Sequence, residues 1–126
     1  MTPFGAKLRE MRKENQMSLK DLAQAIGVSS AYLSALEHGQ RSRPSWYLIQ
    51  RVIAHFNIIW DEAEELEKLA ALSHPRVTID TSQLSPSATE LANRLAGNIN
   101  KLSEQELQTM LAIIAAASLT VSAEMG

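Results

Sequence analysis

The chain has 126 residues, of which 45% are hydrophobic and 5% aromatic, and its formal net charge is −2. This length predicts one domain, or one small domain with an appendage, and the hydrophobic fraction excludes a wholly disordered protein. Because there is no cysteine and the three histidines are scattered, we expect no disulfide framework, no metal site and no cofactor. With no signal-like N-terminus and no apolar run of membrane-spanning length, a soluble, cytoplasmic protein is expected.

The charge is divided unevenly along the chain. Residues 1–56 hold eight Lys or Arg and four acidic residues, whereas residues 57–126 hold four basic and ten acidic residues. The first part therefore carries a net charge of +4 and the second a net charge of −6. A basic part joined to an acidic part indicates an anion-facing domain followed by a separate module.

Helical periodicity and helix caps dominate the beginning of the chain. Thr2 is expected to cap a first helix, and Ser18 with Asp21 has the spacing of a capping box at the start of a second. Gly27 is expected to end that helix, because glycine tolerates the left-handed conformation of a helix end. A third helix is predicted at residues 29–38.

Two more helices are expected before the composition changes. Pro44 is expected to open the fourth helix, and Asp61 to begin a fifth that runs to about Leu72. The two tryptophans, Trp46 and Trp60, are expected to pack in the core or at an interface rather than to stack on a ligand. The first part of the chain is therefore predicted to be a five-helix bundle.

The composition changes after the fifth helix. Residues 73–85 are rich in Ser, Thr and Pro, with alternating apolar residues at 76–80, and predict a linker that contains a short strand. Residues 86–126 predict two further helices, the second opened by a capping box at Ser103. We therefore expect an all-α chain with a five-helix domain at 1–72, followed by this linker and a C-terminal helical extension.

The segment "SLKDLAQAIGVSSAYLSALEHGQRSRP" has the pattern of two helices joined by a sharp turn. Reading a DNA sequence requires side chains in the major groove, which admits one helix braced by another across a short turn. Leu22 and Leu33 supply apolar contacts between the two helices, and Gly27 permits the turn. The exposed face of the later of these two helices, at residues 29–38, is uncharged, which suits insertion into a groove. Its members are Ser30, Ala31, Tyr32, Ser34 and Ala35.

Residues 4–56 resemble the lambda-repressor-like, xenobiotic-response-element family of helix-turn-helix regulators. The ungapped match covers "LREMRKENQMSLKDLAQAIGVSSAYLSALEHGQRSRPS". The resemblance implies a five-helix bundle that binds, as a dimer, a near-palindromic operator in double-stranded DNA. It also implies base-reading positions at Ser30, Ala31, Tyr32 and Ala35, and phosphate-contacting positions at Ser18, Lys20, Ser34, Arg41, Ser42 and Arg43.

One position departs from the family pattern. Many members have a glutamine at the first residue of the second helix, where it braces a phosphate and a base-reading side chain. This chain has Leu19 there, so that bridge is not implied. Of the groups nearby, Glu37 is interpreted as a structural ion-pair or capping group, and Arg12 fits a DNA contact and a solvated face equally well. Arg9 is interpreted as part of a solvated face.

The predicted function is a sequence-specific, dimeric transcriptional regulator that acts as a repressor. Residues 76–121, with an apolar helix stripe and a lone strand, are the expected homodimer interface. Alternatively, these helices fold back on their own domain, or the acidic half binds a partner protein in the manner of an antitoxin. A small-molecule effector is unknown. An enzyme is not expected, since the chain has no nucleophile–base set and no phosphate-binding loop.

Overall fold

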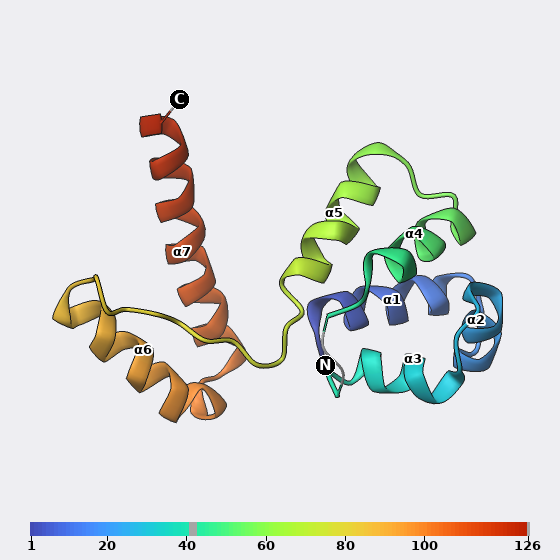
Figure 1. Ribbon diagram of the computed structural model, residues 1–126, viewed down its shortest axis with the longest axis horizontal. Helices are drawn as coiled ribbons and strands as arrows, with labels where there is room; N and C mark the ends of the chain where they lie inside the picture. The colour runs from blue at the N-terminus through green and yellow to red at the C-terminus, as the bar shows by residue number, and fades with distance from the viewer. Residues whose placement is uncertain (41–42, 126) are drawn as a thin grey trace. The chain divides into compact units, whose positions relative to one another are not determined.

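The computed structural model describes residues 1–40 and 43–125, and its contacts divide the chain into two units. Unit 1 is Met1–Thr78 and unit 2 is Ile79–Gly126. The elements (Figure 1) are α1 (Pro3–Glu14), α2 (Leu19–Ile26), α3 (Ser30–Glu37), α4 (Trp46–His55), α5 (Trp60–Ala71), α6 (Pro86–Asn98), the 3-10 turn η1 (Ile99–Lys101) and α7 (Glu104–Met125). An all-α fold with five helices followed by two is confirmed.

The helix starts follow the caps expected from the sequence, with two differences. The hydroxyl of Thr2 accepts the backbone N–H of Gly5 at 3.0 Å, and the capping box of Ser18 is formed. However, α4 begins at Trp46, because the hydroxyl of Ser45 accepts the N–H of Leu48 and leaves the preceding proline outside the helix.

The fifth helix also differs at its start. It begins at Trp60, one residue before Asp61, and no side chain caps it. Trp60 has φ +52°, a conformation uncommon for a bulky residue, and its side chain is 84% exposed. Trp46 is 64% exposed. Neither tryptophan therefore lies in the core, contrary to one of the two roles expected for them.

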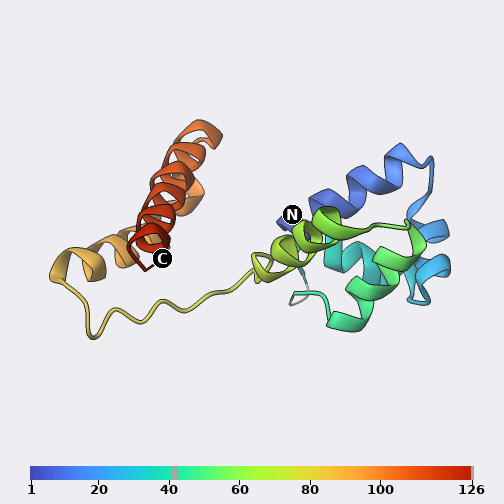
Figure 2. The same cartoon turned by 90° about the horizontal axis from the view of Figure 1, so that it is seen from above.

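The strand expected at residues 76–80 is not formed. That segment has neither helix nor strand, as Figure 2 shows, and no strand occurs anywhere in the described part of the chain. A strand requires a neighbour to complete its hydrogen bonds, and the described residues supply none. Residues 73–85 contain neither helix nor strand. The division between the units falls after Thr78, so the first residues of the linker belong to unit 1.

Unit 1 is built around a single apolar core to which all five helices contribute. Its members are Phe4, Leu8, Met11, Leu22, Ala23, Ile26, Leu33, Leu36, Leu48, Ile49, Val52, Leu66 and Ala70. Within the unit α1 lies between α3 and α5 and contacts both (Figure 1), while α2 packs on α3 and α4. The start of α1 is tied to the end of α5, since Ser73 accepts the N–H of Phe4 at 2.9 Å.

Unit 2 has helices, but its described residues form no core of their own. None of its described side chains is buried, and α6 and α7 diverge from η1 (Figure 1). The hydroxyl of Ser103 accepts the N–H of Glu106, whose carboxylate in turn accepts the N–H of Ser103, as the sequence predicted. Large apolar side chains are nevertheless exposed on α6, η1 and α7, namely Leu91, Ile99, Leu111, Ile113, Ile114 and Leu119.

Candidate nucleic-acid interface

The pair α2 and α3 is joined by a turn whose geometry follows from its residues. Gly27 has φ 77° and ψ 33°, the left-handed conformation that glycine adopts without steric cost. The N–H of Val28 returns to the carbonyl of Ala23 at 3.0 Å, which satisfies the end of α2. Ser29 then caps α3 by accepting the N–H of Tyr32 at 3.0 Å. The turn is thus short and fixed at both ends.

The outer face of α3 holds the positions to which the resemblance assigned base reading. Ser30 and Ala31 are exposed, whereas Tyr32 and Ala35 are half-buried. Tyr32 packs against the core as well as facing outward, so part of its ring supports the bundle. All four side chains lie on one short helix of eight residues and none is charged. The face can therefore enter a groove without stripping water from a charge.

The positions assigned to phosphate contacts lie around that face. Lys20 and Ser18 lie at the start of α2 and are exposed, as is Arg43 after α3, whereas Ser34 is half-buried on α3. The hydroxyl of Ser18 already accepts the N–H of Asp21 at 3.0 Å, so its own O–H is the group left to donate to an oxygen. Two further assigned positions, Arg41 and Ser42, lie outside the described residues.

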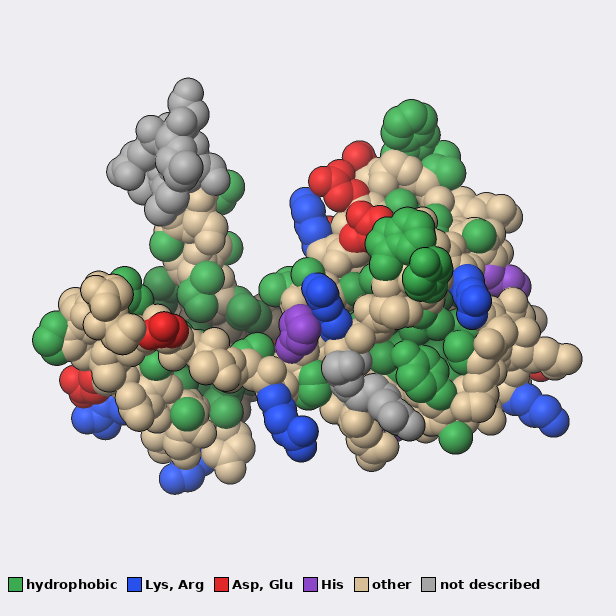
Figure 3. Space-filling view, in the orientation of Figure 1, with side chains coloured by type: hydrophobic (Ala, Val, Ile, Leu, Met, Phe, Trp, Pro, Cys, Tyr) green, Lys and Arg blue, Asp and Glu red, His purple; other side chains and the backbone are tan. Residues whose placement is uncertain are grey.

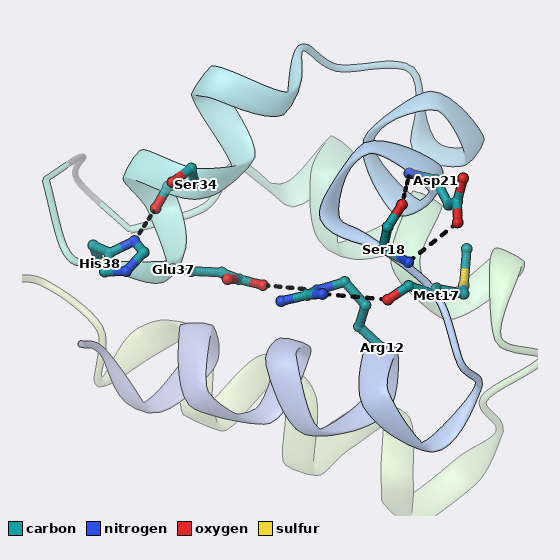
Figure 4. A network of polar contacts seen from close by, with 7 residues as sticks. All are labelled: Arg12, Met17, Ser18, Asp21, Ser34, Glu37 and His38. Carbon is teal, nitrogen blue, oxygen red and sulfur yellow. Dashed lines mark hydrogen bonds and ion pairs between the residues drawn. The ribbon is translucent and has the colours of Figure 1, made fainter.

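Behind this face, polar contacts attach α3 to α1 (Figure 4). Glu37, 2% exposed, receives the Nε of Arg12 at 3.5 Å, and Nη1 of Arg12 donates to the carbonyl of Met17 at 3.2 Å. The interpretation of Glu37 as a structural ion-pair group is confirmed. Arg12 is turned inward, with its side chain only 15% exposed, so it pairs with Glu37 and is not part of a solvated face, which was one of the two roles considered for it.

The capping box of α2 also sets a charge at the edge of this surface. Two hydrogen bonds from Ser18, the stronger effect being that of its backbone N–H at 3.2 Å, hold the pKa of Asp21 below its usual value. Asp21 is therefore ionised at neutral pH, and its negative charge interacts favourably with the positive N-terminal end of α2. Lys20 lies next to it and lowers the same pKa further through its charge.

Two supporting residues were missed from the sequence. A Cβ on Gly5 would lie 2.5 Å from the carbonyl oxygen of Glu37, so only glycine lets α1 approach the end of α3 this closely. The guanidinium of Arg51 donates to the carbonyl of Ile26 at 3.4 Å, across the end of α2. Both contacts join residues at least 25 positions apart, and no local pattern in the sequence signals them.

Two properties of the described residues bear on other kinds of site. No helix among them is both long and apolar enough to cross a membrane. Within the same part of the chain, no group of three or more His, Cys, Asp or Glu residues is placed to hold a metal ion.

Comparison with known proteins gives the same assignment as the geometry. A family model described as a helix-turn-helix domain matches residues 3–73. The HTH-type transcriptional regulator SinR of Bacillus subtilis is 33% identical over 68 residues, covering 51% of this chain and 61% of SinR. An uncharacterized HTH-type transcriptional regulator of the same organism, RghRB, is 34% identical over 61 residues, covering 48% of this chain and 44% of RghRB.

A third relative, the HTH-type transcriptional repressor RghR of B. subtilis, is 33% identical over 61 residues, which are 48% of this chain and 45% of RghR. The chain spans about half the length of the curated relatives it matches. All three are named as transcriptional regulators or repressors. No solved structure gives a significant match. The matched residues contain α1 to α5, and the chain belongs to the helix-turn-helix domain family of transcriptional regulators.

Proposed function

We propose that the protein is a dimeric transcriptional repressor that reads a near-palindromic operator in bacterial DNA with α3. The observation that carries the proposal is the uncharged outer face of α3, capped at its start and held from behind by α1. A groove-inserted helix needs such a face and such a brace. As a DNA-bound regulator the protein acts in the cytoplasm, at the nucleoid.

The contacts divide into two classes in this proposal. Ser30, Ala31, Tyr32 and Ala35 read base edges, where small hydroxyl and methyl groups suit the thymine methyl and the polar edges of bases. Phosphates are contacted by Ser18, Lys20, Ser34 and Arg43 around them, together with the assigned Arg41 and Ser42. The basic excess of residues 1–56, at +4, supports this second class.

Dimerisation is assigned to unit 2. Exposed leucine and isoleucine side chains on α6 and α7, without one buried residue in the described part of the unit, are a surface that requires a partner. A second copy satisfies that requirement and also supplies the second reading helix that a palindrome needs. Repression is proposed because a small protein bound at a promoter excludes polymerase, and because the relative RghR is named a repressor.

Selection of genomic fragments by the purified full chain, at two salt concentrations, tests the proposal. The expected result is enrichment of a near-palindrome with half-sites about ten base pairs apart, bound more weakly at the higher salt. Binding without a common motif would contradict sequence reading. A motif with a single half-site would contradict the dimer. Transcription from a promoter that carries the motif should then fall when the protein is added.

A further inference from the structure

Unit 1 also contains a groove that is separate from the outer face of α3, because no described residue of α3 lines it. The groove has a volume of about 600 Å³ and is bounded by the second half of α1, the end of α4 and the start of α5. Its floor is apolar and consists of Met11, Met17, Phe56, Ile58 and Leu66, all buried or half-buried. Grooves of about 300–1,000 Å³ with such floors are typical of small-molecule sites.

The rim of the groove is negatively charged. Glu14, Asp61, Glu62 and Glu65 all line it, are exposed, and form no ion pair within the described residues. The opposing cation is Lys7, which lies 3.8 Å from Glu10, a residue outside the groove. The one histidine in the lining, His55, packs edge-on against Phe56. The rim therefore has an excess of carboxylates over an apolar floor.

The helix dipole favours only two of these four carboxylates. Asp61 and Glu62 lie in the first turn of α5, where negative charge is favourable next to the helix N-terminus. Glu14 is the last residue of α1, where negative charge is unfavourable, and Glu65 lies further along α5. The helix dipole does not favour a carboxylate at Glu14 and gives Glu65 no particular benefit, whereas a positive charge in the groove would complement both.

Further apolar surface lies beside the same rim. Ile59 and Trp60 directly precede Asp61 and are 66% and 84% exposed. Figure 3 shows acidic and hydrophobic side chains on the exposed surface of unit 1 around α5. Exposed apolar side chains therefore directly precede the acidic residues of the rim along the chain.

We propose that this groove binds a lipophilic organic cation, a molecule with an apolar body and one delocalised positive charge. Its body would leave water for the floor formed by Met11, Phe56 and Leu66, and its charge would face Glu14, Glu62 and Glu65 across the mouth. The face of the Phe56 ring, which carries the negative part of its quadrupole, adds attraction to a cation placed over it. Such a ligand leaves the outer face of α3 free, so the site is distinct from the proposed DNA contacts.

Tetraphenylphosphonium and tetraphenylborate test the proposal, because they share one shape and carry opposite charges. Titration calorimetry on the full chain should show one cation bound per chain, at least tenfold more tightly than the anion, with binding weakened by added salt. The ε-methyl NMR signals of Met11 and Met17 should shift, while that of Met110, in unit 2, should not. Equal binding of both ions, or shifts confined to Met110, would overturn the proposal.

Matched variants on one helix locate the charge. The double variant Glu62→Gln, Glu65→Gln should bind tetraphenylphosphonium about tenfold more weakly, because two carboxylates near the mouth are neutralised. The control Glu64→Gln, Glu67→Gln removes the same charge from α5 outside the groove and should bind as the parent chain does. These substitutions replace exposed side chains with isosteres and leave the fold intact. A similar loss in both double variants would refute a localised site.

Discussion

Tyr32 and Arg43 represent the two kinds of DNA contact that the proposed function requires. Tyr32→Ala should change the preference among operator sequences, because the proposal assigns its half-buried side chain to base reading. Tyr32 also packs on the core, so Tyr32→Phe, which removes only the hydroxyl, separates base contact from packing. Competition binding with operator and random DNA is the measurement. Equal losses on both DNAs for Tyr32→Ala would remove the residue from the base-reading set.

Arg43 is expected to contribute equally to the binding of every DNA sequence. Arg43→Ala should weaken binding to operator and to random DNA by the same factor, and should reduce the slope of log affinity against log salt by about 1. The matched control is Arg9→Ala, an exposed arginine on α1 that the proposal leaves out of the interface. An unchanged salt slope for Arg43→Ala would show that the side chain does not neutralise a phosphate.

The close approach of α1 to the end of α3 depends on the missing side chain of Gly5. Gly5→Ala should lower the free energy of unfolding of unit 1 by about 1–3 kcal/mol, because the new methyl meets backbone atoms of Glu37, which have no room to rotate away. Urea unfolding followed by tryptophan fluorescence reports on unit 1 alone, since both tryptophans, Trp46 and Trp60, lie in it.

A second glycine serves as the control for this substitution. A Cβ on Gly97, within α6, meets no atom within 4 Å. Gly97→Ala should therefore leave unit 1 unchanged and raise the helicity of unit 2 slightly, since alanine is favoured over glycine in a helix by about 1 kcal/mol. Equal effects of the two substitutions on unit 1 would show that the close approach at Gly5 is not what holds α1 to α3.

At the scale of the element, α7 depends more on its cap than the helices of unit 1 do, because little of it is buried. The N–H and the hydroxyl of Ser103 hold the pKa of Glu106 below its usual value. Since the folded pKa is depressed, the cap stabilises α7 fully above the unfolded pKa, and this stabilisation is lost as the pH falls through the lower, folded pKa.

The expected result is a loss of helicity at the start of α7 on acidification. NMR titration of the Glu106 carboxyl in the full chain measures its pKa, and the amide signals of the first turn report helicity. In Ser103→Ala the pKa should rise in part, because the hydroxyl that lowers it is removed while the backbone N–H of residue 103 can still donate to the carboxylate. A carboxyl that titrates identically in the two chains would show that the capping box is not formed in solution.

At the scale of the whole molecule, the two units differ in what they can do alone. Unit 1 has a complete core, so a chain truncated after Thr78 should fold. Without α6 and α7 it should be monomeric in sedimentation velocity, whereas the full chain should be a dimer. A truncated chain that dimerises as tightly as the full chain would place the interface in unit 1, and a monomeric full chain would exclude the proposed homodimer.

Point variants test the same interface without removing it. Leu111→Glu and Ile114→Glu place charge on exposed apolar positions of α7, 57% and 60% exposed, and should make the full chain monomeric with unit 1 still folded. The control Gln108→Glu adds the same charge at an exposed polar position of α7 and should leave the dimer intact. Operator affinity should fall with the dimer, since each monomer then binds one half-site.

The sequence by itself determined the positions of the helices and the turn between α2 and α3. Caps at Thr2, Ser18 and Ser103, and the left-handed residue Gly27, act on backbone groups within a few residues, so local spacing is sufficient to predict them. Where the local signals were ambiguous, the boundaries shifted, as at Pro44 and Asp61. The uncharged character of the outer face of α3 also followed from periodicity, because its apolar residues had to face the core, but only Ser30 and Ala31 of that face are exposed.

The tertiary structure alone decided which distant groups meet. The approach of Gly5 to Glu37 and the inward turn of Arg12 join segments that are far apart in the sequence, and only packing brings them together. The groove beside α1 likewise combines three separate segments, and the exposure of Trp46 and Trp60 depends on which core positions other residues filled. A hydrophobic residue is generally expected to be buried, but the volume available in the close-packed core decides which hydrophobic side chains are buried.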